Sequence, residues 1–351
     1  MAGNKVLTYG EIMLRLQPPG YARLSQAHSF DINYGGAEAN FAVSLANFGI
    51  DATFFTKIPK GLLGDACLAS LNSLRVETKH ILRGGERLGI YYVEKGVAQR
   101  PSVVIYDRKN SAINDISEAE ISDEKLEEIF KDIRVFHFTG ITAALSDSVR
   151  RTLIRLLEVA KKHAVIVSCD LNYRKALWDR STACATMTEL MRYVNILISN
   201  EDECRDVFGL EAENTNTVKG TLNIAGYEKL AKKLHNKFNS LDYIAFTLRG
   251  SISASVNKWS AILSVRGECF RSREYEIDIV DRIGSGDAFC AGLIAGIINP
   301  ATLGFTKQQQ VIEFATAASC LKHTIEGDFN RVSLDDVLRL IAGDGSGRVI
   351  R

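Results

Sequence analysis

The sequence lacks the features that mark several protein classes. Its 43 Lys and Arg residues almost balance its 42 Asp and Glu residues, so no overall charge attracts the chain to nucleic acid. The seven cysteines are an odd number and include no C-x-x-C pair, which gives no sign of zinc or redox chemistry and predicts reduced, mostly buried thiols. The chain contains no Gly-Lys dipeptide, which argues against a P-loop enzyme.

Long hydrophobic runs are also missing. The longest apolar stretch, Ala288 to Ile298, is too short to cross a bilayer. Residues 1–7 do not have the charged and then apolar pattern of a signal peptide. We therefore expect a cytoplasmic protein that has no membrane partner.

The middle of the chain alternates between short β-branched runs and amphipathic segments. These segments are Arg134–Phe138, Ser148–Lys162, Val165–Asp170, Ala185–Tyr193 and Asn195–Ser199. This alternation predicts βαβ units and an α/β fold with a central, mostly parallel sheet flanked by helices. No internal repeat or linker is visible, so we expect a single domain over residues 1–351.

One region breaks this pattern. Gly89–Glu94 and Ser102–Tyr106 are predicted as two strands with no helix between them. Two earlier extended stretches, Ile12–Gln17 and Phe30–Tyr34, are able to pair with them. We expect a small β lid beside the main sheet, formed by residues 12–34 and 87–109.

The strongest local motif is the run D-R-I-G-S-G-D-A-F at residues 281–289, which leads into the apolar helix. Gly284, Ser285 and Gly286 allow backbone N–H groups to converge near a helix N-terminus, where an anion such as a phosphoryl group is favoured. Asp287 is placed to accept a proton from an attacking hydroxyl. A glycine-rich turn whose Asp caps the helix explains a lone G-S-G-D equally well.

A second glycine motif, G-G-A-E-A-N at residues 35–40, lies at a predicted change from strand to helix. Gly35 and Gly36 allow a ligand to approach the backbone closely. Asn40 offers both a donor and an acceptor to a polyol hydroxyl. The alternative is an ordinary helix start with Asn40 satisfied inside the fold.

Together the two motifs resemble the two signatures of the ribokinase-like (PfkB) carbohydrate kinase family. The resemblance spans nearly the whole chain and implies ATP-dependent phosphorylation of a sugar hydroxyl, on a ribokinase-like sheet with a small β lid. It further implies that Asp287 is the base and that the N–H groups of Gly284, Ser285 and Gly286 form an anion hole.

The same resemblance extends to the nucleotide side. The family's N-x-x-E element matches Asn200 and Glu203, which implies Mg²⁺ held through water, although acids also favour any helix N-terminus. The strand Tyr243–Leu248, which contains Thr247, leads into residues 249–253. This segment begins with Arg249 and Gly250 and resembles the family's nucleotide-contacting turn. The sequence departs from the family pattern at Ser253, where glycine is common, and at Arg282, where threonine is common.

Three segments are similar to those of family members that act on 2-keto-3-deoxygluconate. They are Gly89–Glu94, Arg100–Arg108 and Asp170–Arg174. Arg108 and Arg174 are able to flank one carboxylate, and Tyr91 and Tyr106 add hydroxyl groups. The alternatives are ordinary sheet packing for the tyrosines, an edge charge for Arg108 and a local Asp partner for Arg174. His137 is expected to be a satisfied core residue.

Other functions fit some of the same motifs. A fructokinase- or ribokinase-like enzyme would share both signatures, and a non-catalytic sugar sensor would share the fold. A Rossmann oxidoreductase does not fit Gly284-x-Gly286, because Phe289 stands where a third small residue is needed. We expect a small sugar acid and ATP as ligands, and a lid contact between copies of the chain would give a homo-oligomer.

Overall fold

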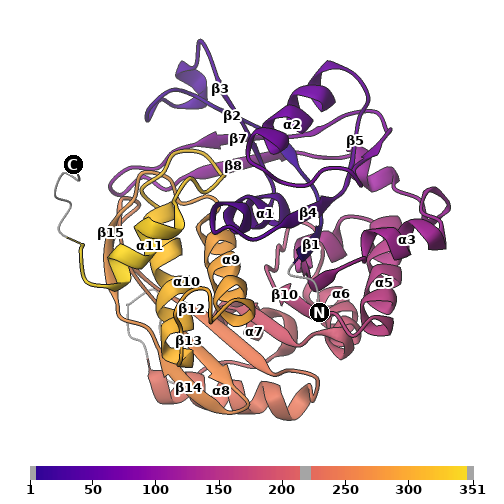
Figure 1. Ribbon diagram of the computed structural model, residues 1–351. Helices are drawn as coiled ribbons and strands as arrows, with labels where there is room; N and C mark the ends of the chain where they lie inside the picture. The colour runs from indigo at the N-terminus through magenta and orange to yellow at the C-terminus, as the bar shows by residue number, and fades with distance from the viewer. Residues whose placement is uncertain (1–4, 214–222, 346–351) are drawn as a thin grey trace.

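The computed structural model describes residues 5–213 and 223–345. Within them the main sheet has the order β14-β13-β12-β11-β10-β9-β1-β4, and β15 also pairs with β13 (Figure 1). Its strands are β1 (Lys5–Tyr9), β4 (Ala52–Phe55), β9 (Ile133–Thr139), β10 (Ile166–Asp170), β11 (Ile196–Ser199), β12 (Tyr243–Ser251), β13 (Val256–Val265), β14 (Glu268–Arg271) and β15 (Tyr275–Asp278). The pairs from β4 to β12 are parallel, whereas β13 pairs antiparallel with β12, β14 and β15.

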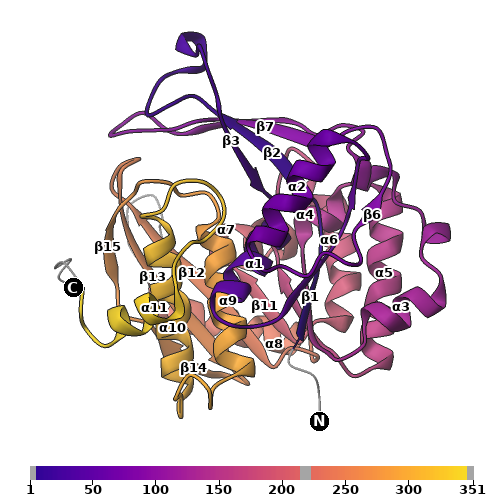
Figure 2. The ribbon, with the colours of Figure 1, turned by 45° about the horizontal axis from the view of Figure 1, so that its top comes forward.

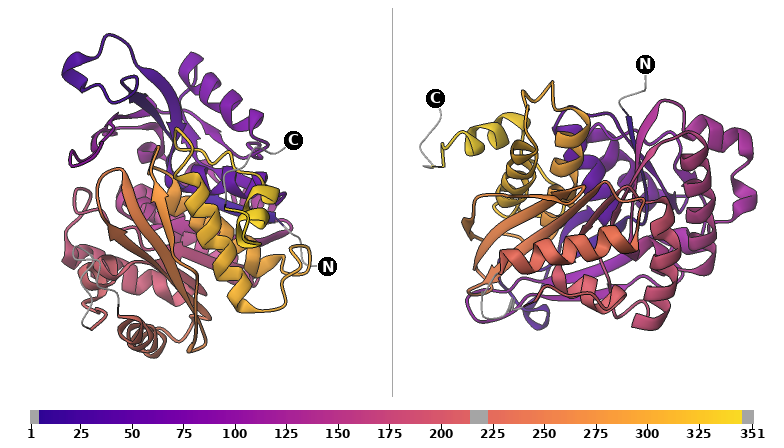
Figure 3. Two further views of the ribbon diagram at one scale, coloured as in Figure 1. Left: turned by 90° about the vertical axis from the view of Figure 1, so that its left-hand side faces the viewer. Right: turned by 90° about the horizontal axis from the view of Figure 1, so that it is seen from below.

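Helices cover both faces of this sheet (Figure 3). They are α1 (Ala37–Asn47), α2 (Leu62–Ser73), α3 (Asp123–Ile129), α4 (Gly140–Ala144), α5 (Asp147–Lys162), α6 (Arg180–Leu190), α7 (Glu201–Phe208), α8 (Ile224–Lys237), α9 (Ser285–Ile298), α10 (Gln308–Lys322) and α11 (Leu334–Ile341). Short 3-10 turns lie at Leu24–Gln26, Ala112–Asp115, Glu118–Glu120 and Met191–Tyr193. The predicted α/β fold with a mostly parallel sheet is confirmed.

The strands are buried on both faces because successive side chains point to opposite sides. Val6 packs into the core cluster that contains α1, α9 and α10, whereas Leu7 packs into the cluster on the other face with α5, α6 and α8. Val135 and Phe136 of β9 divide between the two clusters in the same way. The sheet therefore separates two hydrophobic cores.

Helix α5 shows how local sequence fixes an element. Ser146 accepts a hydrogen bond from the Val149 N–H and caps the helix. Leu153, Leu156, Leu157 and Ala160 recur on one face and are all fully buried. The predicted helix and its packing face are confirmed, with a start at Asp147 in place of Ser148.

A separate four-stranded sheet has the order β3-β2-β7-β8 and stands above the main sheet in Figure 2. Its strands are β2 (Met13–Gln17), β3 (Asp31–Gly35), β7 (Gly89–Glu94) and β8 (Val103–Asp107). Each lies within one residue of the predicted bounds. A two-stranded sheet joins β5 (Lys57–Ile58) to β6 (Leu82–Arg83).

The turn predicted over residues 249–253 begins later than expected, so its start at Arg249 and Gly250 was wrong. Strand β12 continues to Ser251, and Gly250 pairs with Lys258 of the antiparallel strand β13. The hairpin ladder keeps these residues extended, so the turn comes after Ser251, where Ser253 Oγ accepts from the backbone N–H groups of Ser255 and Val256.

Three smaller predictions concern single side chains and membrane spans. All seven cysteines are free and five are buried, as predicted. His137 is buried, its Nδ1 lies 3.1 Å from Ser168 Oγ, and burial lowers its pKa to about 3, as expected of a core histidine. Among the described residues no helix is long and apolar enough to span a membrane.

Candidate functional site

One cavity of about 890 Å³ lies where the carboxyl ends of β10, β11 and β12 meet the N-termini of α1, α7 and α9. Open α/β sheets bind ligands at this edge. The cavity is lined by most of the predicted site residues: Gly36, Asn40, Tyr91, Tyr106, Arg108, Arg174, Asn200, Glu203, Thr247, Arg249, Gly284, Ser285, Gly286 and Asp287. Gly35 and Gly250 lie just outside its lining.

The glycine-rich loop before α9 has the geometry of an anion site. Gly284 caps the helix with φ of 83°, and a Cβ there would lie 2.1 Å from the Asp328 carbonyl oxygen, so only glycine fits. Ser285 Oγ donates to the Arg282 carbonyl at 2.8 Å. A Cβ on Gly286 would meet nothing within 4 Å, so space is open in front of the first helical turn. The Gly286 and Asp287 N–H groups lack intrahelical acceptors and are available to an anion, whereas the Ser285 N–H makes a long hydrogen bond of 3.4 Å to the Arg282 carbonyl.

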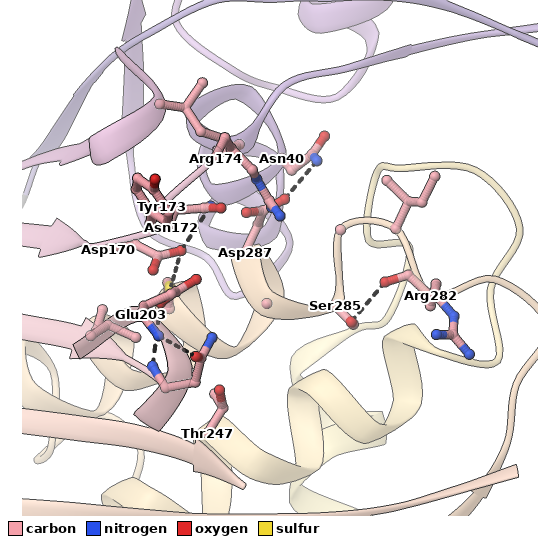
Figure 4. Close-up of a pocket in the computed structure, with 18 of the residues that line it drawn as sticks. Asn40, Asp170, Asn172, Tyr173, Arg174, Glu203, Thr247, Arg282, Ser285 and Asp287 are labelled. Atoms are coloured by element: carbon pink, nitrogen blue, oxygen red, sulfur yellow. Dashed lines mark hydrogen bonds between the residues drawn. The ribbon is translucent and has the colours of Figure 1, made fainter. Parts of the chain in front are cut away.

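Asp287 lies in the first turn of α9 and faces Asn40 of α1 (Figure 4). Asn40 Nδ2 donates to Asp287 Oδ2 at 2.7 Å, and Asn40 Oδ1 accepts from the Gly36 N–H at 3.4 Å. Burial raises the pKa of Asp287 to about 7, partly offset by the Asn40 hydrogen bond. The carboxyl is thus oriented by a fixed amide and is poised to exchange a proton near neutral pH.

Other carboxyl groups gather beside Asp287. Burial, and then the charges of Glu203 and Asp287, raise the pKa of Asp170 well above its usual value. Burial also raises the pKa of Glu203. Arg174 lowers the pKa of all three carboxyls, yet it forms no ion pair with any described residue. The alternative of a local Asp partner for Arg174 is therefore not realised, and its guanidinium is available to a ligand.

Asn200 and Glu203 form a reciprocal cap on α7. Asn200 Oδ1 accepts from the Glu203 N–H at 3.0 Å, and Glu203 Oε2 accepts from the Asn200 N–H at 3.3 Å. Asn200 and Glu203 therefore cap helix α7 and also line the cavity. Within residues 5–213 and 223–345, no three His, Cys, Asp or Glu side chains are close enough to hold a metal ion directly. Oxygen donors at this spacing suit a hydrated hard cation.

The lid side of the cavity is also rich in hydrogen bonds. Arg108 Nε donates to Glu11 Oε2 at 2.8 Å, and its guanidinium lies 5.4 Å from the Tyr106 ring centre. Tyr91 stacks on Tyr106 and donates its hydroxyl to Asp328. Arg108 is thus neutralised by an acid, unlike Arg174.

A buried ion cluster behind the site was missed by the sequence reading. Arg15 of β2 donates to Asp281 Oδ2 at 2.6 Å and to Asp328 Oδ1 at 2.7 Å, and all three side chains are almost fully buried. Asp328 also lies against Gly35, where an added Cβ would sit 2.1 Å from its Oδ2. The one local sign of this cluster in the sequence is the charged residue Arg15 between Leu14 and Leu16, within a strand whose side chains alternate between two faces.

Sequence and structure comparisons define the class of protein. The pfkB family carbohydrate kinase pattern matches residues 4–330, and the chain belongs to this family. It is an ATP-dependent carbohydrate kinase. The chain is 31% identical to the 2-dehydro-3-deoxygalactonokinase of Haloferax volcanii over 98% of each chain.

Solved structures agree. The 2-dehydro-3-deoxygluconokinase of Thermotoga maritima shares 45% identity, with a TM-score of 0.90 over 97% of this chain and 99% of that one. A putative ribokinase II from E. coli, in complex with ATP and Mg²⁺, has 20% identity and a TM-score of 0.77 over 97% and 99% of the two chains. The second likeness concerns the fold alone, and the expected ribokinase-like fold is confirmed.

Proposed function

We propose that the enzyme phosphorylates 2-keto-3-deoxygluconate (2-dehydro-3-deoxygluconate) at its primary hydroxyl, giving 2-keto-3-deoxy-6-phosphogluconate and ADP. One observation carries the proposal: the Arg174 guanidinium has no ion-pair partner among the described residues and lies in the cavity beside Asp287. A guanidinium binds a carboxylate with two hydrogen bonds, whereas a neutral hexose needs only hydroxyl partners. The likeness to the Thermotoga maritima enzyme supports the same acceptor.

In the proposed step, Asp287 accepts the proton of the acceptor hydroxyl as its oxygen bonds to the γ-phosphorus. The bond between that phosphorus and the β-phosphate bridging oxygen breaks, and ADP leaves with the electron pair. The N–H groups of Gly284, Ser285 and Gly286 stabilise the charge on the transferred group. Asn40 holds the Asp287 carboxyl toward the cavity at 2.7 Å.

The remaining residues are assigned by position. Gly35, Gly36 and Asn40 form the polyol side of the site, with Gly35 supporting it from behind. The lid closes this side with Tyr91, Tyr106 and Arg108. Glu11 balances the charge of Arg108, so the net positive charge for the substrate carboxylate comes from Arg174. Thr247, Arg249 and Gly250 belong to the nucleotide side, on β12.

The cavity residues fit a hydrated Mg²⁺. Glu203 and Asn200 would hold the ion through water, because buried oxygen donors surround this position and the like charges of Asp170 and Glu203 repel each other. When bound, the ion would neutralise charge on the nucleotide phosphates.

Arg174→Gln tests the acceptor. We expect KM for 2-keto-3-deoxygluconate to rise about tenfold to one-hundredfold, because a hydrogen-bonded charge pair with the substrate is lost. Residual turnover of neutral sugars should not change. Steady-state kinetics with the keto acid, its galactonate epimer, fructose and ribose would measure this. Arg180→Gln, which removes an exposed arginine paired with Asp206, is the matched control. An unchanged KM for the keto acid would refute the carboxylate role.

We also propose that the lid carries a contact between two copies of the chain. Strand β8 lies at the edge of the lid sheet, and Val103, Val104, Ile105 and Tyr106 are 36% to 51% exposed. An exposed apolar edge strand readily pairs with another strand. Sedimentation should show a dimer that Ile105→Lys converts to monomer, and a wild-type monomer at all concentrations would contradict this proposal.

A further inference from the structure

Two arginines, Arg249 and Arg282, lie on the nucleotide side of the cavity. Thr247, Arg249 and Ser251 alternate along β12 on one face, and all three line the cavity. Arg282 enters the same space from the loop before α9. Among the described residues neither arginine forms an ion pair. Arg249 Nε donates to Ser251 Oγ at 3.0 Å and Arg282 donates to the Ala254 carbonyl at 2.8 Å.

Burial lowers the pKa of Arg282, and the charge of the preceding Asp281 offsets this effect only in part. The Asp281 carboxylate is bound to Arg15 at 2.6 Å on the buried side of the loop. Burial lowers the pKa of Arg249, and the charge of Arg282 lowers it further. Two like charges on one cavity wall repel each other, and an anion between them would remove this cost.

The position of the pair indicates which anion it binds. The carboxyl groups of Asp170 and Asp287 lie on the sugar side, where the charge of Arg174 acts on both. In Figure 4 Arg282 lies beyond Ser285, away from Asp287 and Asn40, whereas Thr247 of β12 lies below Glu203. The phosphoryl donor must reach the anion hole from the side opposite the acceptor hydroxyl, because attacking and leaving oxygens are in line.

We propose that Arg282 and Arg249 together bind the phosphates of the nucleoside di- or triphosphate. The anion-hole loop then contributes a positively charged side chain, Arg282, in addition to its N–H groups. Guanidinium groups bind phosphate oxygens with paired, charge-assisted hydrogen bonds. Threonine, which is common in the family at the position of Arg282 in the signature at residues 281–289, is uncharged. The inference depends on the carbohydrate kinase class and not on the identity of the sugar acid.

Calorimetric titration with ATP, ADP and adenosine, without sugar and at constant Mg²⁺, tests the inference. Arg282→Gln should weaken ATP and ADP binding about tenfold to one-hundredfold and leave adenosine binding unchanged. Arg282→Lys should restore part of the loss, because lysine keeps the positive charge but cannot donate two parallel hydrogen bonds as a guanidinium does. Arg249→Gln should give a similar loss without altering the loop. Arg266→Gln, an exposed arginine paired with Asp242 outside the cavity, is the control.

Three outcomes would overturn the inference. Equal weakening of adenosine and ADP would mean that Arg282 only shapes the loop. In a separate titration with 2-keto-3-deoxygluconate alone, weaker binding to Arg282→Gln, with nucleotide binding unchanged, would place the pair in the acceptor site. Unchanged binding of all ligands would mean that neither arginine contacts them. Because the nucleotide titration contains no sugar, failure of the proposed acceptor leaves that test intact.

Discussion

Replacing Asp287 by asparagine is expected to lower kcat by about 10²- to 10⁴-fold, because the amide cannot accept the proton of the acceptor hydroxyl. The fold should survive, since the asparagine carbonyl still accepts the hydrogen bond that Asn40 now donates to the carboxylate. Coupled ADP release measures the rate, and the melting temperature reports the fold.

The control for this variant is Asp242→Asn, which removes an acid outside the cavity whose one ion-pair partner in the described part of the chain is Arg266. It should retain wild-type kcat. A value of kcat for Asp287→Asn close to that of the control would remove Asp287 from the role of base and leave phosphate positioning as the main source of catalysis.

The pH profile gives a second view of the same residue. Because burial raises the pKa of Asp287 to about 7, the carboxylate needed for proton acceptance forms only as the pH rises through neutrality. We expect kcat/KM to increase with pH below about 7 and to level off above it. An acid limb with a midpoint near the ordinary aspartate pKa would mean that another group controls the profile.

Replacing Arg15 by methionine should be the most destabilising single change considered for this chain. Asp281 and Asp328 would be left buried without their partner, and the loss of one member of a buried ion cluster typically costs about 3–5 kcal/mol of unfolding free energy. The variant should also raise KM for the sugar, because Asp328 contacts both Gly35 and Tyr91. Denaturant-induced unfolding measures the first effect.

The comparison variant is Arg151→Met, which breaks an exposed pair with Glu118 and should have a much smaller effect. Arg15→Met combined with Asp281→Asn and Asp328→Asn should recover part of the stability, because the uncompensated charges are removed as well. If Arg15→Met and Arg151→Met unfold at the same denaturant concentration, the buried cluster does not stabilise the lid on the main body.

Local pattern was enough to predict the layout of the fold. The lid strand Gly89–Glu94 has the predicted bounds, and the amphipathic face of α5 is buried as expected. The two glycine motifs are about 250 residues apart, yet the structure brings Asn40 and Asp287 into hydrogen-bond contact. Short motifs predict these site residues because the backbone geometry at some positions, such as Gly284, accepts only one residue type.

The partners of the charged residues were not predictable from local pattern. Arg108 pairs with Glu11 and Arg15 pairs with Asp281 and Asp328, and each pair joins segments far apart in the sequence. Charge pairing depends on tertiary positions, which periodicity does not encode. The predicted end of β12 was wrong for a related reason. Pairing with β13 keeps Arg249, Gly250 and Ser251 in the strand, although these residues do not themselves favour β-structure.

The most direct test of the account is the acceptor preference of the wild-type enzyme, measured by coupled ADP release with ATP and Mg²⁺. The panel is 2-keto-3-deoxygluconate, 2-keto-3-deoxygalactonate, fructose and ribose. We predict that the keto acids have a much higher kcat/KM than the neutral sugars, because only they bring a carboxylate to Arg174. Higher kcat/KM with fructose or ribose would contradict the acid-sugar assignment and point to a neutral-sugar kinase of the same family.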